Sequence, residues 1–325
     1  RDFVWLVHPR NAEDYIKKIP ILKFFSEKTI FFITKHFWPF VVSTIYSEKK
    51  HIKGYVVVVP LVPEQIALNK KLAVKKTKQS LKLARKLGAK NISLGGFLTS
   101  IVYNNKLDKD FDFNFFDGTH LLTQLAFKKI KNILHEQNIN YKNTSFSIIG
   151  ATTKTGAMLS KILCHDNFDN LYFFGRTLKN LEDLKKECLE INKNANIQIS
   201  TDLSGLANCD FVILSAYLKD ETDVIKYFKN GIIFLSIVEP ISPFVFDLEK
   251  ERKDIKLIKG VFIETPGVSY EGYDFGLPKG NSFACVTEAI MLINNKEAGK
   301  SIVSDNLEES QKIVENLLSD YKFKV

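Results

Sequence analysis

The chain has 325 residues, of which 45% are hydrophobic and 26% are charged, so it can form two or three domains with large cores. No apolar run is long enough to cross a membrane as a helix, and the four cysteines are scattered without CxxC or metal-ligand spacing. We therefore expect a cytoplasmic protein with no metal site and no spanning helix.

Residues 1–116 are expected to form an N-terminal α/β substrate domain. Strands are predicted at Asp2–His8 and in the β-branched stretches VVSTIYS and GYVVVVPL. A helix is predicted over Ile21–Phe37, ending before Pro39. Its many aromatic residues are expected to pack in the core, with an acyl channel or a membrane contact as the alternatives.

The stretch from Asn69 to Lys90 contains the whole positive excess of the chain. It holds nine Lys and Arg residues and no acidic residue, and the formal net charge of the chain is +9. Its apolar residues recur at helical spacing, which predicts an amphipathic helix. Its basic stripe consists of Lys71, Lys75, Lys78 and Lys82.

The basic stripe should attract an acidic partner, although a solvated helix face is the alternative. An anionic membrane surface would be attracted by the same charges. A nucleic acid is not expected, because no base-stacking aromatic side chains are interleaved with the lysines. A strand then runs into the glycine pair Gly95 and Gly96 in NISLGGFLTSIV.

Residues 117–265 alternate strands and helices, which predicts a doubly wound parallel sheet of the Rossmann type. A linking helix is expected over Thr119–Gln137 because its apolar residues have helical spacing. The strands are expected at 144–150, 170–175, 197–201, 210–216, 231–238 and 256–264.

The sequence SIIGATTKTGAMLSKIL indicates a strand, a glycine turn and a helix N-terminus, which together can hold a pyrophosphate. An NAD site would have an Asp or Glu at the end of the next strand, but here Gly175 and Arg176 occupy that place. A guanidinium there suits the 2′-phosphate of NADPH. An ordinary βαβ unit with a structural glycine is the alternative. The expected cofactor-binding residues are Gly150, Thr152, Thr153, Gly156, Arg176 and Thr177.

Residues 266–325 are expected to form a glycine-rich loop and two helices, at about 282–295 and 306–321. Cys285 lies in GNSFACVTEAIMLI, in the first turn of the first of these helices. A helix N-terminus stabilises a thiolate, which is the nucleophile that opens a thioester. A small buried apolar residue is the alternative role for a single cysteine.

Several segments resemble, in the same order, the long-chain acyl-[acyl-carrier-protein] reductases and their shikimate- or amino-acid-dehydrogenase-like relatives. They are KGYVVVVPLVPEQ, LGGFLTSIV, GTH, SIIGATTKTGAMLSKIL and SFACVTEAIMLI. The resemblance covers nearly the whole chain and implies NADPH-dependent reduction of an acyl thioester to a fatty aldehyde. The substrate would be carried by acyl carrier protein or coenzyme A, and Cys285 would hold the acyl group.

The resemblance also places His120 by the active cleft, where it could donate a proton. A capping or core role is the alternative for this histidine. The chain departs from the family pattern at Thr153, which replaces a glycine, and at Gly118, where the family often has Asn. The Thr153 side chain could crowd the pyrophosphate or donate a hydrogen bond to it.

Two other functions stay open. A dehydrogenase of a small hydroxy or amino acid, similar to shikimate dehydrogenase, would need a base but no thiol. A non-catalytic Rossmann protein would hold an anionic partner on its basic helix and would not bind NADPH.

Overall fold

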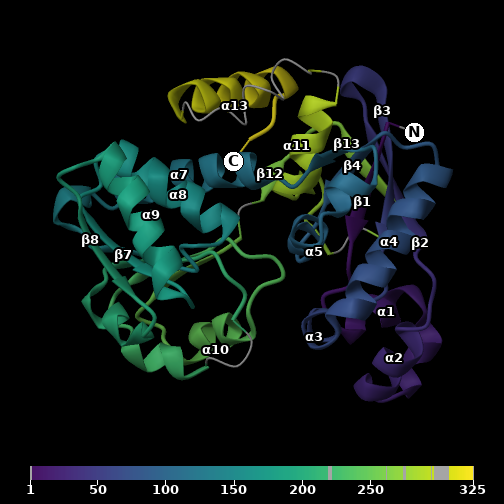
Figure 1. Ribbon diagram of the computed structural model, residues 1–325, viewed down its shortest axis with the longest axis horizontal. Helices are drawn as coiled ribbons and strands as arrows, with labels where there is room; N and C mark the ends of the chain where they lie inside the picture. Colours follow the sequence, from purple (N-terminus) through teal and green to yellow (C-terminus); the bar gives the residue numbers. More distant parts are fainter. Residues whose placement is uncertain are drawn as a thin grey trace. The chain divides into compact units, whose positions relative to one another are not determined.

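The computed structural model describes residues 2–218, 222–260, 262–273, 276–293, 295 and 307–324. The chain divides into two compact units, each built on its own sheet (Figure 1). Unit 1 comprises residues 1–118, 262–302 and 312–324, and unit 2 comprises 119–261, 303–311 and 325. The predicted α/β class with a doubly wound parallel sheet is confirmed.

Unit 1 contains a six-stranded sheet in the order β13-β2-β3-β1-β4-β5. Its central part is parallel and consists of β3 (Ile52–Val58), β1 (Phe3–Val7), β4 (Asn91–Leu94) and β5 (Asn114–Phe116). Every residue of β1 is buried, as expected for a parallel strand covered on both faces. The carboxyl ends of these four strands meet at one edge of the sheet.

The antiparallel side of this sheet comes from distant parts of the chain. β2 (Phe40–Ser47) pairs with β3, and β13 (Val268–Gly272) pairs with β2. β12 (Ile263–Glu264) pairs with β14 (Asn281–Ser282) in a small separate sheet. The sequence predicts residues 266–325 as a separate C-terminal region, whereas in the structure β13 of this region is an edge strand of the unit 1 sheet.

The helices of unit 1 cover this sheet. The predicted single helix over 21–37 is wrong, because Ser26 interrupts it: its Oγ accepts a hydrogen bond from the Thr29 N–H at 3.3 Å and caps a new helix. The elements are α1 (Ala12–Lys18), η1 (Pro20–Phe24), α2 (Glu27–Thr34), η2 (Lys49–His51), α3 (Pro63–Leu68), α4 (Lys70–Lys86), α5 (Leu98–Asn104), α6 (Leu107–Asp110), α11 (Ala284–Leu292) and α13 (Leu307–Tyr321), the last of which belongs to unit 1 from residue 312 on.

Unit 2 contains a fully parallel sheet in the order β11-β10-β9-β6-β7-β8. The chain adds strands on one side of β6 and then on the other, so the strand order reverses between β6 and β9. The strands are β6 (Phe146–Ile149), β7 (Asn170–Phe174), β8 (Asn196–Ser200), β9 (Phe211–Leu214), β10 (Ile233–Ser236) and β11 (Lys256–Lys259).

Alternate residues of these strands enter two apolar clusters on opposite faces of the sheet. In β9, Phe211 and Ile213 pack in the cluster that contains residues of α7, α8 and α9, whereas Val212 and Leu214 pack with residues of α10. Helices therefore cover both faces, which is the doubly wound arrangement. They are α7 (Thr119–Glu136), η3 (Tyr141–Asn143), α8 (Lys154–His165), α9 (Leu178–Ile191), η4 (Leu203–Asn208), η5 (Thr222–Tyr227) and α10 (Pro243–Glu251).

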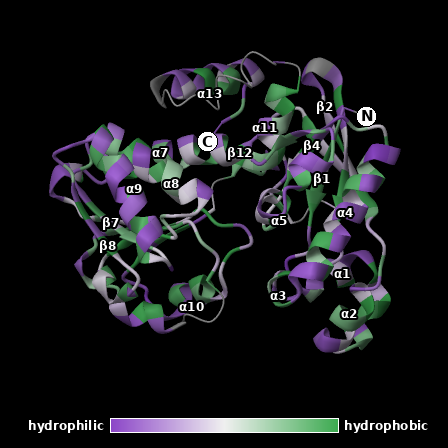
Figure 2. Ribbon diagram, viewed as in Figure 1, coloured by the Kyte–Doolittle hydropathy of each residue, from purple (hydrophilic) through white to green (hydrophobic). Residues whose placement is uncertain are grey.

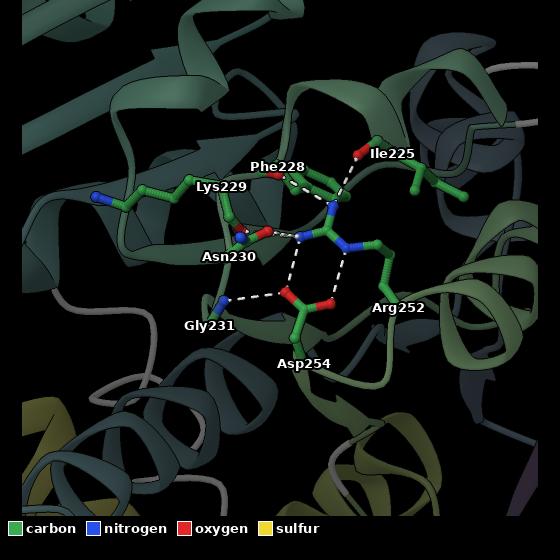
Figure 3. Close-up of polar contacts among 7 residues, drawn as sticks. All are labelled: Ile225, Phe228, Lys229, Asn230, Gly231, Arg252 and Asp254. Atoms are coloured by element: carbon green, nitrogen blue, oxygen red, sulfur yellow. Dashed lines mark hydrogen bonds and ion pairs between the residues drawn. The ribbon is translucent and has the colours of Figure 1, made fainter.

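An ion pair between Arg252 and Asp254 joins the end of α10 to the turn before β10 (Figure 3). The guanidinium donates to both carboxylate oxygens of Asp254, at 2.9 and 2.8 Å, and to the Phe228 carbonyl at 3.0 Å. Asp254 also accepts the Gly231 N–H at 3.1 Å. These hydrogen bonds, that from Arg252 foremost, lower the pKa of Asp254 below its ordinary value.

Figure 2 shows hydrophilic residues on the helices of both units beside hydrophobic ones. Among the described residues, no helix is both long and apolar enough to cross a membrane.

Candidate functional site

In unit 2, β6 ends in a tight turn at Gly150. This glycine has φ +83, and a Cβ on it would lie 2.4 Å from the Ala216 Cβ, so a side chain does not fit. The Gly150 N–H donates to the Phe174 carbonyl at 2.8 Å. The turn thus lies between the ends of β7 and β9, at the point where the strand order reverses. Open α/β sheets bind ligands at this point.

The N-terminus of α8 packs directly on this turn. A Cβ on Gly156 would lie 2.2 Å from the Gly150 carbonyl oxygen, so only glycine allows this approach. Thr153 is the N-cap of α8: its Oγ1 accepts the Gly156 N–H at 3.0 Å and donates to the Ser215 carbonyl at 3.3 Å. The Thr153 hydroxyl therefore has two partners within the protein, and it holds α8 against the end of β9.

The end of β7 lies beside the same turn. A Cβ on Gly175 would be 3.3 Å from the Thr152 Oγ1, so the Thr152 side chain lies next to this strand end. Arg176 follows and is exposed, and Thr177 is the N-cap residue of α9, without a side-chain capping bond. The structure thus brings the six predicted cofactor-binding residues to one edge of unit 2.

These residues could hold a nicotinamide adenine dinucleotide. The two glycines let the first turn of α8 pack directly on the turn after β6, which places the N-terminus of this helix at the point where the strand order reverses. Arg176 provides a cation at the end of β7 for a further phosphate.

In unit 1, Cys285 lies in the first turn of α11, whose N-cap is Phe283. The thiol is half-buried, and burial raises its pKa to about 12. Hydrogen bonds from the Trp5 side chain and the Val286 N–H act in the opposite direction, and the charge of Glu288 raises the pKa further. Burial therefore outweighs the helix N-terminus, and Cys285 is a protonated thiol near neutral pH.

Two residues of the central strands position this turn of α11. Trp5 of β1 and Ser93 of β4 are paired across the two strands. The Ser93 Oγ donates to the Cys285 carbonyl at 2.9 Å, and the Trp5 ring lies 5.8 Å from the Phe283 ring between centroids. Sequence reasoning missed both residues, because a single Trp or Ser in an apolar strand gives no signal of what it faces.

Gly118 follows β5 and is pressed against the same helix turn. It has φ +74, and a Cβ on it would lie 2.4 Å from the Cys285 backbone N. Its N–H donates to the Glu288 Oε1 at 3.0 Å, and the Glu288 side chain is buried. The departure from Asn at this position therefore has a steric reason in this chain: the close approach of α11 leaves no room for a side chain.

His8, at the end of β1, is a buried supporting residue. Its Nε2 accepts the Phe97 N–H at 3.2 Å, so its proton resides on Nδ1, which donates to the Pro9 carbonyl at 3.0 Å. Burial lowers the pKa of His8, which is therefore a neutral imidazole near neutral pH. A Cβ on Gly96 would lie 2.5 Å from Nε2, which explains one glycine of the predicted pair.

His120 lies in the first turn of α7, in unit 2, and is half-buried. Its carbonyl accepts the Thr123 Oγ1 hydrogen bond at 3.0 Å. It follows Gly118, the last residue of that stretch of unit 1, by two residues in the chain. The proton-donating role that the resemblance implies for His120 stays a prediction.

The predicted basic helix is α4, and most of its cations are exposed. Lys71, Lys75 and Lys82 of the basic stripe are exposed, whereas Lys78 forms an ion pair with Asp110 at 3.0 Å. Lys76 is buried and donates to the Phe37 carbonyl at 2.6 Å. The described residues contain no group of His, Cys, Asp and Glu side chains that could hold a metal ion.

Comparison with family models and with curated proteins gives no match. Similar solved structures include malate dehydrogenase from Cryptosporidium parvum, with 18% identity and a TM-score of 0.29 over 36% of this chain and 45% of that one. L-tryptophan dehydrogenase from Nostoc punctiforme has 12% identity and a TM-score of 0.41, over 98% and 78% of the two chains. Lactate dehydrogenase from Eimeria maxima has 12% identity and a TM-score of 0.32, over 55% and 74%.

Three of the similar structures align over less than half of their own length, including the Cryptosporidium malate dehydrogenase. The fold of this chain is established by its own strand order and glycine turn, both described above.

Proposed function

We propose that the chain is an NADP(H)-dependent oxidoreductase. The observation that carries this proposal is the glycine turn of unit 2, which lies where the strand order reverses and has an arginine at the end of the neighbouring strand. The α8 N-terminus would hold the pyrophosphate, and Arg176 would bind the 2′-phosphate. When bound, NADPH supplies a hydride.

The test of the cofactor is the variant Arg176→Ala. A charge-assisted contact to a phosphate is worth about 1.5–3 kcal/mol, so the dissociation constant for NADPH should rise about tenfold or more. The constant for NADH, which lacks the phosphate, should stay nearly the same. Lys179→Ala, an exposed cation in the first turn of α9, is the matched control. If the affinities for NADPH and NADH fall equally, Arg176 does not bind the 2′-phosphate.

For the reaction, we propose the reduction of an acyl thioester to an aldehyde, as the family resemblance implies. The Cys285 sulfur would form a bond to the acyl carbon while the bond to the carrier sulfur breaks. The thiol proton would pass to the departing carrier thiolate, so the step needs no further reagent. A raised thiol pKa requires this proton to leave as the bond forms. The Trp5 side chain and the Val286 N–H donate hydrogen bonds to the Cys285 sulfur, and both would stabilise a thiolate that forms there.

A second candidate is a dehydrogenase of a small hydroxy or amino acid. The observation that favours it is the partial burial of Cys285 in the first turn of α11, because a half-buried thiol suits a packing residue as well as a nucleophile. Malate dehydrogenase and L-tryptophan dehydrogenase belong to this class of reaction by their names.

Cys285→Ser separates the two candidates. The intact mass of the wild-type chain, measured after incubation with an acyl thioester in the absence of NADPH, should increase by one acyl group. The variant should show no adduct and no aldehyde formation, and it should still bind NADPH. The other three cysteines are buried, so a single cysteine adduct is expected on Cys285. Turnover retained in the variant would favour the small-acid dehydrogenase.

For the partner, we propose that an acidic acyl carrier protein docks on α4. The support is the exposed positive charge of Lys71, Lys75 and Lys82 along one helix. Lys78 contributes less to this surface because Asp110 pairs with it. Coenzyme A, which carries phosphates, is the alternative acyl carrier.

A further inference from the structure

Large apolar side chains are exposed at one end of unit 1. Nine large hydrophobic residues are exposed among those that the structure describes, and five of them lie within residues 21–38. Phe24, Phe32 and Trp38 are 77%, 62% and 72% exposed. The expectation that this stretch packs in the core is therefore wrong for most of its rings. We call these five residues the aromatic patch: Ile21, Phe24, Phe25, Phe32 and Trp38.

The patch is exposed because the helices beneath it bury other residues. Tyr15, Leu22, Ile30 and Val62 form a small buried cluster that joins α1, η1, α2 and the start of α3. The Gln65 Nε2 also donates to the Phe31 carbonyl at 2.9 Å. Figure 1 shows α1, α2 and α3 at the same end of unit 1, and Figure 2 shows both hydrophobic and hydrophilic residues on α2. These short elements bury a few apolar residues each and leave the five residues of the aromatic patch exposed.

Lysines accompany the aromatic patch. Residues 17–38 contain five lysines and one acidic residue, Glu27, so their formal charge is +4. The Lys23 Nζ lies 5.0 Å from the centre of the Phe24 ring, and the Lys35 Nζ lies 4.3 Å from the centre of the Phe32 ring. These positive charges therefore lie directly beside the exposed rings. A ligand of this surface must accept aromatic rings and also neutralise the ammonium groups next to them.

We propose that the aromatic patch docks on the surface of an anionic lipid bilayer. The headgroup layer provides phosphates, and the acyl chains just below it provide an apolar phase for the rings. Lysine stems can reach back from the apolar layer to the phosphates. A second copy of this chain fits less well, because a two-fold contact would bring the same +4 segments together and bury like charges. The proposal does not depend on the cofactor or on the reaction.

The test is sedimentation with vesicles, without substrate or cofactor. The purified chain should sediment with vesicles of phosphatidylcholine mixed with phosphatidylglycerol, and much less with phosphatidylcholine alone. Added salt should weaken this binding, because the lysines are exposed. Trp5 is buried and Trp38 is exposed, and they are the two tryptophans of the chain, so a blue shift of tryptophan emission on binding would report Trp38. Trp38→Phe should abolish the shift and keep most of the binding.

Two sets of variants separate rings from charges. Phe24→Ser and Trp38→Ser should each lower the vesicle partition coefficient about tenfold, since each removes one ring from the bilayer. Lys23→Glu and Lys28→Glu should each lower it about fivefold or more. The matched controls, Leu178→Ser and Phe246→Ser for the rings and Lys186→Glu and Lys193→Glu for the charges, are exposed positions of unit 2 and should have no effect.

The proposal is overturned by any of three results. The first is no binding to the phosphatidylglycerol vesicles, and the second is equal losses in the patch and control variants. The third is a dimer in solution that Phe24→Ser dissociates without lipid, which would assign the aromatic patch to a second copy of the chain. Because the assay measures no catalysis, its failure would leave the proposed oxidoreductase activity untouched.

Discussion

Gly118 is the position at which a single added methyl group should have the largest effect on the Cys285 turn. In Gly118→Ala, the new Cβ would lie 2.4 Å from the Cys285 backbone N and 2.5 Å from its Cα. Neither atom can move without shifting the start of α11. The Gly118 N–H bond to the buried Glu288 carboxylate would be distorted by the same shift.

The magnitude follows from two contributions. A left-handed backbone conformation costs a residue with a Cβ about 1–2 kcal/mol, and overpacking against backbone costs about 1–3 kcal/mol more. Gly88 isolates the first contribution, because it has φ +78 and nothing lies within 4 Å of the position that a Cβ would take. Gly88→Ala should therefore lose only about 1–2 kcal/mol, and Gly118→Ala should lose about 2–5 kcal/mol.

The assay is urea unfolding followed by tryptophan fluorescence. Both tryptophans, Trp5 and Trp38, lie in unit 1, so their emission reports the unit that contains Gly118. We expect the midpoint of Gly118→Ala to fall below that of Gly88→Ala by about 0.5–1.5 M urea, for a slope of about 2 kcal/mol per M. The same midpoint for the two variants would show that α11 does not press on Gly118 and would refute the steric argument.

Three further predictions concern charge and protonation. Alkylation of Cys285 by iodoacetamide should accelerate about tenfold per pH unit from neutral pH to about pH 10, because its pKa is about 12; a plateau at about pH 8–9 would contradict this pKa. Arg252→Lys should lower the thermal midpoint of unit 2 by about 2–4 °C in circular dichroism, relative to Lys253→Arg. Because the pKa of Asp254 is lowered in the folded state, its ion pair stabilises the fold fully at pH values above the ordinary pKa of 3.8 and progressively less as the pH falls below it. The difference in thermal midpoint between Arg252→Lys and Lys253→Arg should therefore shrink in acid, and a difference independent of pH would argue against the ion pair. Reversing the charges of the basic stripe should raise the Michaelis constant for an acyl carrier substrate, and should raise it far less for a small uncharged thioester. If neither the charge reversals nor added salt changes the Michaelis constant for the carrier substrate, α4 does not bind the carrier and its lysines are only solvated.

Much of unit 2 could be predicted from the sequence, because its elements are local and regular. The helix predicted over 119–137 is α7, and each predicted strand between 144 and 238 overlaps an observed strand. The glycine turn at Gly150 was also predictable, because a tight strand-to-helix connection needs glycine whatever surrounds it. The fold class and the position of the glycine turn could therefore be predicted from the sequence.

The surroundings of Cys285 were decided only by tertiary structure. Sequence position places this cysteine in the first turn of a helix, but the pairing of Trp5 with Ser93 and the approach of Gly118 join segments more than 100 residues away from it. These neighbours bury the thiol, and burial sets its pKa. Helical spacing in the sequence contains no information about that burial.

The aromatic patch shows the same limit for the surface. The composition of residues 21–38 predicts buried rings, because aromatic residues are usually buried. The cap at Ser26 divides the stretch into two short helices, each of which can bury only one side. An amino-acid sequence specifies which residues are apolar and how often they recur. Which faces of a helix become buried depends on which other elements pack against it, and only the tertiary structure decides that.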